Sequence, residues 1–435
     1  MNRIFLSAAA LAIAAAPAAA QTVAIEGGDV YTAAGTPIRG GTVLIQNGRI
    51  TAVGTGIAIP AGAVRIDARG KWVTPGLIES NTELGLREVE QLDETNDAEI
   101  QDVERRRDDD DQVQAAFNVS DGINPRSMVI PVTRIMGITT AVTRPAGSLI
   151  AGQGIMIDLL GNRVEQMQIV SPIAMFASMS DNARGGVGGP RGAISGRLRE
   201  VLDDARAWAR NREAFERNGT RSYSVSRLDL AALQPVLAGR EPLVVEAHRA
   251  ADIQLAIRLA HEYGIKLIIS GGTEAWMVAD DLARAQVPVI VKVLRNLPES
   301  FESLGATYEN AARLRRAGVQ VAITSGETWK AYTLRQEAGN AVAYGLPWTE
   351  AFRAVTLYPA QIWGVADRYG SLDVGKVANV VVWSGDPLEL LTRVEHVIIR
   401  GQEVPLTSRE TQLRDRYRTL DENRRSYGQP SAAHQ

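Results

Sequence analysis

LVVEAHRAADIQLAIRLAHEYG, residues 243–264, decides the fold, because it places a short apolar strand directly before an amphipathic helix. LVVEAH has the length and the Val content of a buried strand. The segment after it carries apolar residues at the three- and four-residue spacing of a helix with one buried face: Ile253, Ala256, Ile257 and Ala260. We therefore expect a strand–helix unit here.

The same unit recurs along the chain. KLIISGG (266–272), PVIVKV (288–293) and QVAITSG (320–326) each precede a helical stretch, and such alternation predicts parallel strands. Four upstream stretches are further candidate strands: 73–80, 138–145, 155–161 and 172–178. Eight candidates favour an α/β fold, a closed (β/α)8 barrel of TIM type over residues 73–366. The chemistry of such a barrel lies at the C-terminal ends of its strands.

The two ends of the chain have a different pattern. Residues 22–72 and 367–405 alternate apolar and polar residues and are rich in Val and Ile, which is typical of antiparallel strands. Asn47-Gly48 lies between two such runs and predicts a hairpin. Because about fifty residues do not easily close a sandwich alone, we expect both ends to form one small composite β-sandwich that brackets the barrel.

Several parts of the chain carry a resemblance to a known family. VTPGLIESNTELG (73–85) resembles the amidohydrolase-superfamily signature, in which Pro-Gly-Leu-Ile-Asp precedes a His-x-His metal pair. AVTLYPAQIWGVADRYGSLDVGKVANVVVWSGDPLE (354–389) resembles the return from that family's last helices into its sandwich. GITTAVTRPAGSLIAGQG (137–154) and the last four strand–helix units resemble the imidazolonepropionase-like branch. The resemblance implies hydrolysis of amide or other C–N bonds, often in rings, by water activated with one or two divalent metals, usually zinc.

The first metal-ligand positions are not matched. Asn81 and Glu83 stand where the resemblance places the first histidine pair. On the fifth strand, where the family has His-Ala-His or His-Ala-Glu, this chain has Glu246 at the ligand position and His248 two residues later.

The later ligand positions differ too. Gly271 stands at the expected histidine of the sixth strand, and Gly326, followed by Glu327, stands at the expected aspartate after the eighth. The chain has four histidines, and only His248 is placed to face the barrel mouth. We therefore predict that a histidine-based zinc site is absent.

What remains at the predicted mouth is a group of oxygen donors with one histidine: Glu83, Glu246, Glu327, Asn81 and His248. If a metal is held at all, Glu83 and Glu246 are the expected ligands, and their oxygens suit Mg, Ca or Mn better than Zn. Without a metal, repulsion between carboxylates raises one pKa to give a general acid and leaves another carboxylate as a base. The sequence therefore leaves open whether the protein binds a metal cofactor and which metal that is.

Lys292, at the end of the seventh strand, is expected to pair with one of these carboxylates. The expected catalytic groups are Glu246, His248, Glu83 and Lys292, and the expected substrate-binding groups are Asn81, Gln153 and Glu327. A purely structural alternative is that Glu246 and Lys292 form a buried ion pair in the space of the metal, with His248 a hydrogen-bonded core residue.

The N-terminal segment predicts export. Arg3 precedes an apolar run that ends in an Ala-x-Ala site, which is typical of a signal peptide over residues 1–20. We therefore expect a periplasmic or secreted protein without a stable membrane anchor. At the other end we expect a charged helix over 406–428 and a disordered tail over 429–435.

Two functions are open from the sequence. One is a divergent amidohydrolase-type hydrolase acting on C–N bonds, in a non-peptide or cyclic amide, of a small periplasmic substrate. The other is a catalytically inactive binding or scaffold protein that keeps the amidohydrolase fold. The expected partner is a small-molecule substrate or ligand; the mixed charge, net −3, argues against nucleic acid, and self-association into a homo-oligomer is left open.

Overall fold

The computed structural model describes residues 22–99, 112–147, 149–184, 187, 189–217, 219, 221–295, 297–298 and 300–418. The predicted signal peptide and the predicted tail lie outside these residues. Of the predicted C-terminal helix, the described part is α14 (Arg409–Tyr417), which buries no residue.

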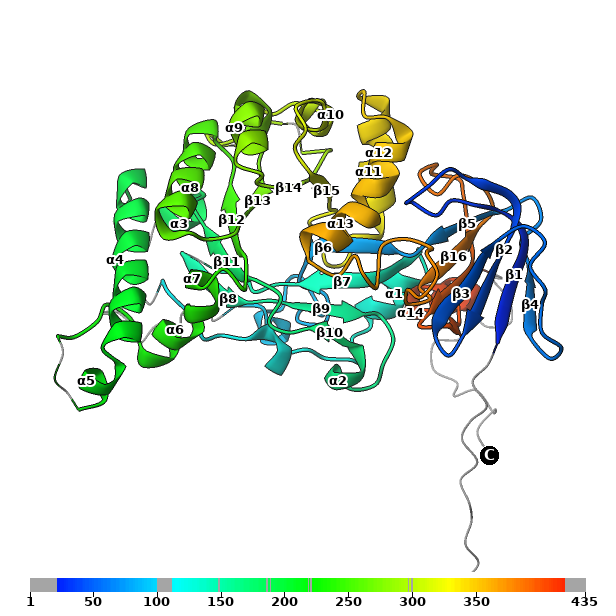
Figure 1. The fold of residues 1–435 in the computed structure, drawn as a ribbon, viewed down its shortest axis with the longest axis horizontal. Coiled ribbons are helices and arrows are strands. Elements are labelled where there is room, and N and C mark those ends of the chain that lie inside the picture. The colour runs from blue at the N-terminus through cyan, green and yellow to red at the C-terminus, as the bar shows by residue number, and fades with distance from the viewer. Residues whose placement is uncertain are drawn as a thin grey trace, which may run out of the picture.

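Strands from both ends of the chain share one eight-stranded sheet, seen in Figure 1 as blue and orange strands at one end of the molecule. The order is β18-β17-β16-β5-β1-β2-β3, with β4 paired to β1. Their bounds are β1 Val23–Val30, β2 Ile38–Gln46, β3 Arg49–Gly54, β4 Val64–Asp67, β5 Trp72–Pro75, β16 Val380–Trp383, β17 Val394–Ile399 and β18 Gln402–Val404. The join is the antiparallel pairing of β16 with β5.

The hairpin predicted at Asn47-Gly48 is confirmed. Both residues have positive φ, 53° and 74°, and they connect β2 to β3, which pair antiparallel. Alternating side chains from both chain ends form a separate apolar core under this sheet, which includes Val23, Val43 and Val380.

The part of the chain between β5 and β16 forms two further sheets. One has the order β10-β9-β7-β6 and the other the order β15-β14-β13-β12-β11-β8. Their bounds are β6 Leu77–Thr82, β7 Ile138–Thr143, β8 Ile150–Gln153, β9 Ile155–Asp158, β10 Gln168–Val170, β11 Met175–Ser178, β12 Leu243–Ala247, β13 Leu267–Gly271, β14 Val289–Val291 and β15 Val321–Ile323. Strands β11 to β15 are parallel neighbours, as the recurring units predict.

One strand of the predicted barrel of eight parallel strands needs correction. The 155–161 candidate forms β9, which runs antiparallel to β7. Only eleven residues separate the end of β7 from the start of β9, and part of them is β8, so there is no room for the crossover helix that a parallel return requires. Within the described residues, no strand ladder joins β15 to β6.

Helices cover the parallel strands on one side, as Figure 1 shows for α8, α9 and α10 beside β12 to β14. The helices are α1 Val129–Arg134, α2 Val164–Met167, α3 Asp181–Arg184, α4 Arg191–Arg210, α5 Arg212–Glu216, α6 Arg227–Ala232, α7 Gln234–Leu237, α8 Ala250–Tyr263, α9 Ala279–Arg284, α10 Asn310–Arg316, α11 Leu334–Ala343, α12 Trp348–Ala354 and α13 Leu357–Ile362. In the described part of the chain, none combines the length and the apolar character of a membrane span.

Candidate active site

Glu79, near the middle of β6, connects this strand to the segment after β15. Its buried carboxylate accepts hydrogen bonds from the backbone amide (2.9 Å) and hydroxyl (2.6 Å) of Ser325, from the Thr324 hydroxyl, and from the Asn81 amide (3.1 Å). Burial raises the pKa of Glu79, and the hydrogen bonds oppose that rise. The sequence analysis missed Glu79, although it alternates with Asn81 and Glu83 on one side of the strand.

Glu246 and His248 contact each other at the end of β12. His248 Nε2 is 3.4 Å from Glu246 Oε1, and His248 Nδ1 is 2.8 Å from the Thr273 hydroxyl. The His248 side chain is 3% exposed, whereas that of Glu246 is 39% exposed. Burial acts to raise the pKa of Glu246, but the hydrogen bond from His248 and the charge of Arg144 outweigh it and lower that pKa. Glu246 is therefore an ionised carboxylate beside a buried imidazole.

Gly271, at the end of β13, makes room for this imidazole. A Cβ at position 271 would lie 2.5 Å from Cε1 of His248, and the residue has a φ of +86°, which side chains rarely adopt. The ring from β12 thus occupies the space next to the position where the resemblance expects a histidine on β13. A histidine at position 271 would therefore clash with the His248 ring in its present place.

Arg144, directly after β7, brings a guanidinium to the same strand ends. Its Nε donates to the Asn81 side-chain oxygen, and its Nη1 lies 3.6 Å from Glu83 Oε1. The side-chain NH2 group of Asn81 in turn donates to the Ser270 hydroxyl at 3.3 Å. A cationic side chain therefore lies among the positions that the resemblance assigns to metal ligands. The sequence signal for Arg144 is its place as the first charged residue after a buried strand.

The two other predicted carboxylates have cationic partners of their own. Glu83 accepts a hydrogen bond from Arg87 at 2.9 Å, and Lys292 Nζ lies 2.6 Å from Glu327 Oε1. The structural alternative of a Glu246–Lys292 ion pair is therefore wrong, because Lys292 pairs with Glu327 and Glu246 contacts His248.

Gln153, predicted to bind substrate, is engaged elsewhere. Its side-chain amide donates to the Ala115 carbonyl at 2.9 Å, and its backbone amide donates to the Phe117 carbonyl at 2.7 Å. These bonds attach β8 to the segment that precedes it. Gln153 therefore stabilises the position of that segment beside the strand ends.

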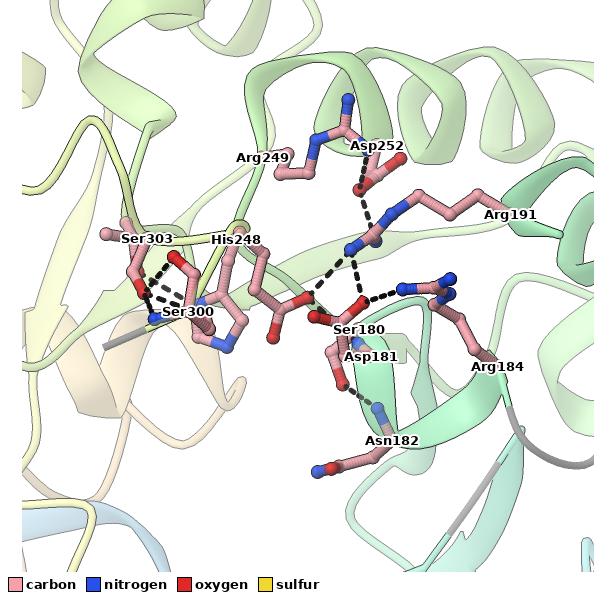
Figure 2. Close-up of polar contacts among 12 residues, drawn as sticks. Ser180, Asp181, Asn182, Arg184, Arg191, His248, Arg249, Asp252, Ser300 and Ser303 are labelled. Carbon is pink, nitrogen blue, oxygen red and sulfur yellow. Dashed lines mark hydrogen bonds and ion pairs between the residues drawn. The ribbon is translucent and has the colours of Figure 1, made fainter. Parts of the chain in front are cut away.

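A second polar cluster, shown in Figure 2, is centred on Arg191 at the start of α4. The guanidinium contacts Asp181, Asp252 at 2.9 Å and Glu302 at 3.4 Å. Glu302 also accepts a hydrogen bond from the Asp181 amide at 2.9 Å. This cluster connects the segments that follow β11, β12 and β14, and so holds the surroundings of His248 in place.

A small hollow lies at the strand ends between these groups. It has a volume of about 40 Å³, and its polar lining comes from Asn81, Arg144, Ser178, Glu246 and Ser270. The Ser178 hydroxyl lies 3.5 Å from the second oxygen of Glu246. A water molecule occupies roughly 30 Å³ of liquid, so the hollow accepts water beside Glu246, and a larger molecule has to lie outside it.

These groups do not fit a divalent metal centre. In the described ranges, no three His, Asp or Glu side chains gather as potential ligands. Zinc sites in proteins generally use three or four such ligands. Glu83 and Glu327 instead face cations, and the guanidinium of Arg144 adds positive charge to the space between the strands.

The chain is similar in sequence to known hydrolases. The Amidohydrolase family matches residues 213–404. The chain is 23% identical over 384 residues to the amidohydrolase tasK of Hapsidospora irregularis, and 34% identical over 116 residues to the imidazolonepropionase of Pseudomonas fluorescens. These matches cover 80% and 26% of this chain, but they span only 38% and 28% of the relatives' own lengths.

The structural similarity is more extensive. An amidohydrolase of known structure from Thermotoga maritima MSB8 is 28% identical, with a TM-score of 0.79 over 88% of this chain and 99% of that chain. The chain is thus similar to amidohydrolase-superfamily hydrolases, which supports that part of the resemblance, and imidazolonepropionase is among its relatives. The absence of the family's metal-binding histidines stays a prediction.

Proposed function

We propose that the chain is a divergent amidohydrolase-type hydrolase that cleaves a C–N bond, in a non-peptide or cyclic amide, of a small periplasmic substrate. The observation that carries the proposal is the ionised carboxylate of Glu246, which lies beside a water-sized hollow at the C-terminal strand ends. Proteins with a similar sequence and fold, named as amidohydrolases and imidazolonepropionase, support the reaction class.

The chemistry assigned to Glu246 is that of a general base. The carboxylate takes a proton from a water in the hollow as the water oxygen bonds to the amide carbon. The C–N bond then breaks, the nitrogen leaves with the proton that Glu246 held, and the products are a carboxylic acid and an amine. The lowered pKa keeps Glu246 ionised at neutral pH, so it is free to accept a proton, and it also makes the carboxylate a weaker base than an ordinary glutamate.

Two neighbours assist Glu246 in this scheme. Arg144 lines the same hollow, so its guanidinium is placed to stabilise the negative charge that develops on the amide oxygen. His248 is a positioning residue, because its buried ring contacts Glu246 and is itself held by Thr273. Glu83 acts indirectly, as a partner of Arg144 and Arg87.

The test is the Glu246→Gln variant, which removes the charge and keeps the shape. Hydrolysis of small lactams and N-acyl compounds should fall by about 10²–10⁴-fold, the usual contribution of a general base. Glu262→Gln is the matched control, because Glu262 is a half-exposed surface residue that pairs with Arg199. Unchanged hydrolysis by a folded Glu246→Gln protein would remove Glu246 from the mechanism.

A catalytically inactive binding protein is the second candidate. It is favoured by the ion pairs that engage Glu83 and Glu327, since paired carboxylates are poor ligands for a metal or a substrate. In that case the purified protein binds a small amide without turnover, and Glu246→Gln changes its affinity but no rate. Product analysis after long incubation separates the two candidates.

The proposed location of this activity is the periplasm. It rests on the basic start, the apolar run and the Ala-x-Ala site of residues 1–20. N-terminal sequencing of protein recovered from the periplasm should begin at Gln21, whereas intact Met1 in the membrane fraction would contradict export.

A further inference from the structure

A groove of about 830 Å³ lies at the opposite end of the parallel strands from the candidate active site. It is lined by residues at the N-terminal ends of β12, β13 and β14, by one side of α8, and by the end of α13. Much of its lining is apolar, with Ile257, Ile265 and Trp363 among the contributing side chains. In folds of this type, this end of the strands is remote from the reaction, so a ligand bound there occupies a second site.

Among the described residues that line this groove, Glu241, just before β12, is the one acidic residue. The residue is 6% exposed, and its Oε1 has no hydrogen-bond partner among the described residues. A buried carboxyl oxygen without a donor is energetically costly, because it has lost its hydrogen bonds to water. Burial alone raises the pKa of Glu241 to about 7. The group therefore offers an unused acceptor to a molecule in the groove.

Basic side chains lie at the rim of the same groove. Arg240 and Lys266 are exposed and line it together with His261. Lys266 is brought beside the Glu241 segment by a backbone hydrogen bond, in which the Leu243 amide donates to the Lys266 carbonyl at 2.8 Å. The groove thus combines a buried acid, an apolar wall and an outer basic rim.

We propose that this groove is a second small-molecule site, which binds a free α-amino acid with an apolar side chain. The ammonium group of the ligand donates to the Glu241 carboxylate, its carboxylate faces Arg240 and Lys266, and its side chain packs on Ile257 and Trp363. An amine lacks the anionic end for the basic rim, and a fatty acid lacks the donor for Glu241. The site is separate from Glu246 and does not depend on the proposed hydrolysis.

Isothermal titration with L-phenylalanine as the probe tests this site. N-acetyl-L-phenylalanine lacks the ammonium group and 2-phenylethylamine lacks the carboxylate, so each removes one expected contact. We expect saturable binding of L-phenylalanine, and at least about tenfold weaker binding of both analogues, because a charge-assisted hydrogen bond contributes more than 1.4 kcal/mol.

Variants assign the binding to the groove. Glu241→Gln should weaken L-phenylalanine binding by at least about tenfold, and Lys266→Met should weaken it to a lesser extent, because Lys266 is exposed to solvent. Glu246→Gln and the surface variant Glu262→Gln should bind as the unaltered protein does. Each of three results would overturn the proposal: no saturable binding, binding unchanged by Glu241→Gln, or 2-phenylethylamine binding as tightly as L-phenylalanine.

Discussion

Acidic side chains at the two ends of the parallel strands differ in the partners that surround them. At the C-terminal ends, Glu79, Glu83, Glu246 and Glu327 each accept a hydrogen bond or face a cation. At the N-terminal ends, Glu241 has only burial acting on it. For Glu246 and Glu241, these local partners and not burial alone decide the direction of the pKa shift.

The contrast is clearest between Glu246 and Glu241, which are five residues apart in the sequence. Burial pushes the pKa of both upward, but His248 and Arg144 reverse this effect at Glu246, while nothing opposes it at Glu241. Glu246 is ionised at neutral pH, whereas Glu241 retains a proton in much of the population. If this comparison is right, substitutions at the two ends should have opposite effects on stability.

The largest loss of stability is expected for Glu79→Ala. The substitution leaves the buried Ser325 amide and the Thr324 hydroxyl without the acceptor that connects β6 to the segment after β15. We expect a loss of about 3–5 kcal/mol in the free energy of unfolding, measured by urea denaturation. Glu79→Gln is the control that keeps the shape and should lose less. A loss below about 1 kcal/mol would show that these hydrogen bonds do not hold the strands together.

The next effect concerns the space beside His248. Gly271→Ala places a Cβ against that ring at a positive φ, and should cost about 2–4 kcal/mol in the free energy of unfolding. In a His248→Ala background the clash disappears and only the backbone strain remains, so the same substitution should cost about 1–2 kcal/mol less. Equal costs in both backgrounds would contradict the close packing of the two residues.

Glu241→Gln should act in the opposite direction and stabilise the protein. The folded-state pKa of about 7 lies above the ordinary value of 4.5, so the folded protein binds this proton more tightly than the unfolded chain does. Stability is then lost as the pH rises from about 4.5 to 7, and it stays lost above pH 7. The variant should therefore be more stable by about 2 kcal/mol at pH 8 and little changed at pH 4.5. Thermal melts at both pH values check this, and a destabilised variant at pH 8 would reverse the comparison.

The smallest effect is expected at the pair of Lys292 and Glu327. Both side chains are about one-third exposed, 32% and 36%, so solvent screens their attraction. Lys292→Met should change the free energy of unfolding by no more than about 1 kcal/mol. A loss several times larger would mean that this pair is a main connection between the segments after β14 and β15.

The recurring strand–helix pattern predicted most of the fold because it is local. Apolar spacing within LVVEAH and the following helix is enough to indicate β12 and α8, and the Asn47-Gly48 turn indicates the β2–β3 hairpin. Strand direction is not local in this sense. The antiparallel course of β9 follows from the short connection after β7, which the sequence analysis did not weigh against the barrel.

The candidate site was predicted less completely. Alternation along β6 and β12 identified the residues that reach the strand ends, but it does not show which cation meets which carboxylate. Lys292 has Glu327 as its partner because their strand-end segments are adjacent, and Arg144 reaches Asn81 from a neighbouring strand. Such contacts depend on the register between segments far apart in the sequence, and they cannot be read directly from a single sequence.

The central claim is that arginine, lysine and histidine side chains stand at the strand ends in place of a bound metal. The most direct measurement is the zinc content of the purified protein after dialysis against a chelator. The account predicts much less than one equivalent, because the ion pairs of Glu83 and Glu327 and the packing of His248 leave too few ligands. One equivalent of zinc that resists the chelator would contradict the account, since it requires ligands that these strand ends do not bring together.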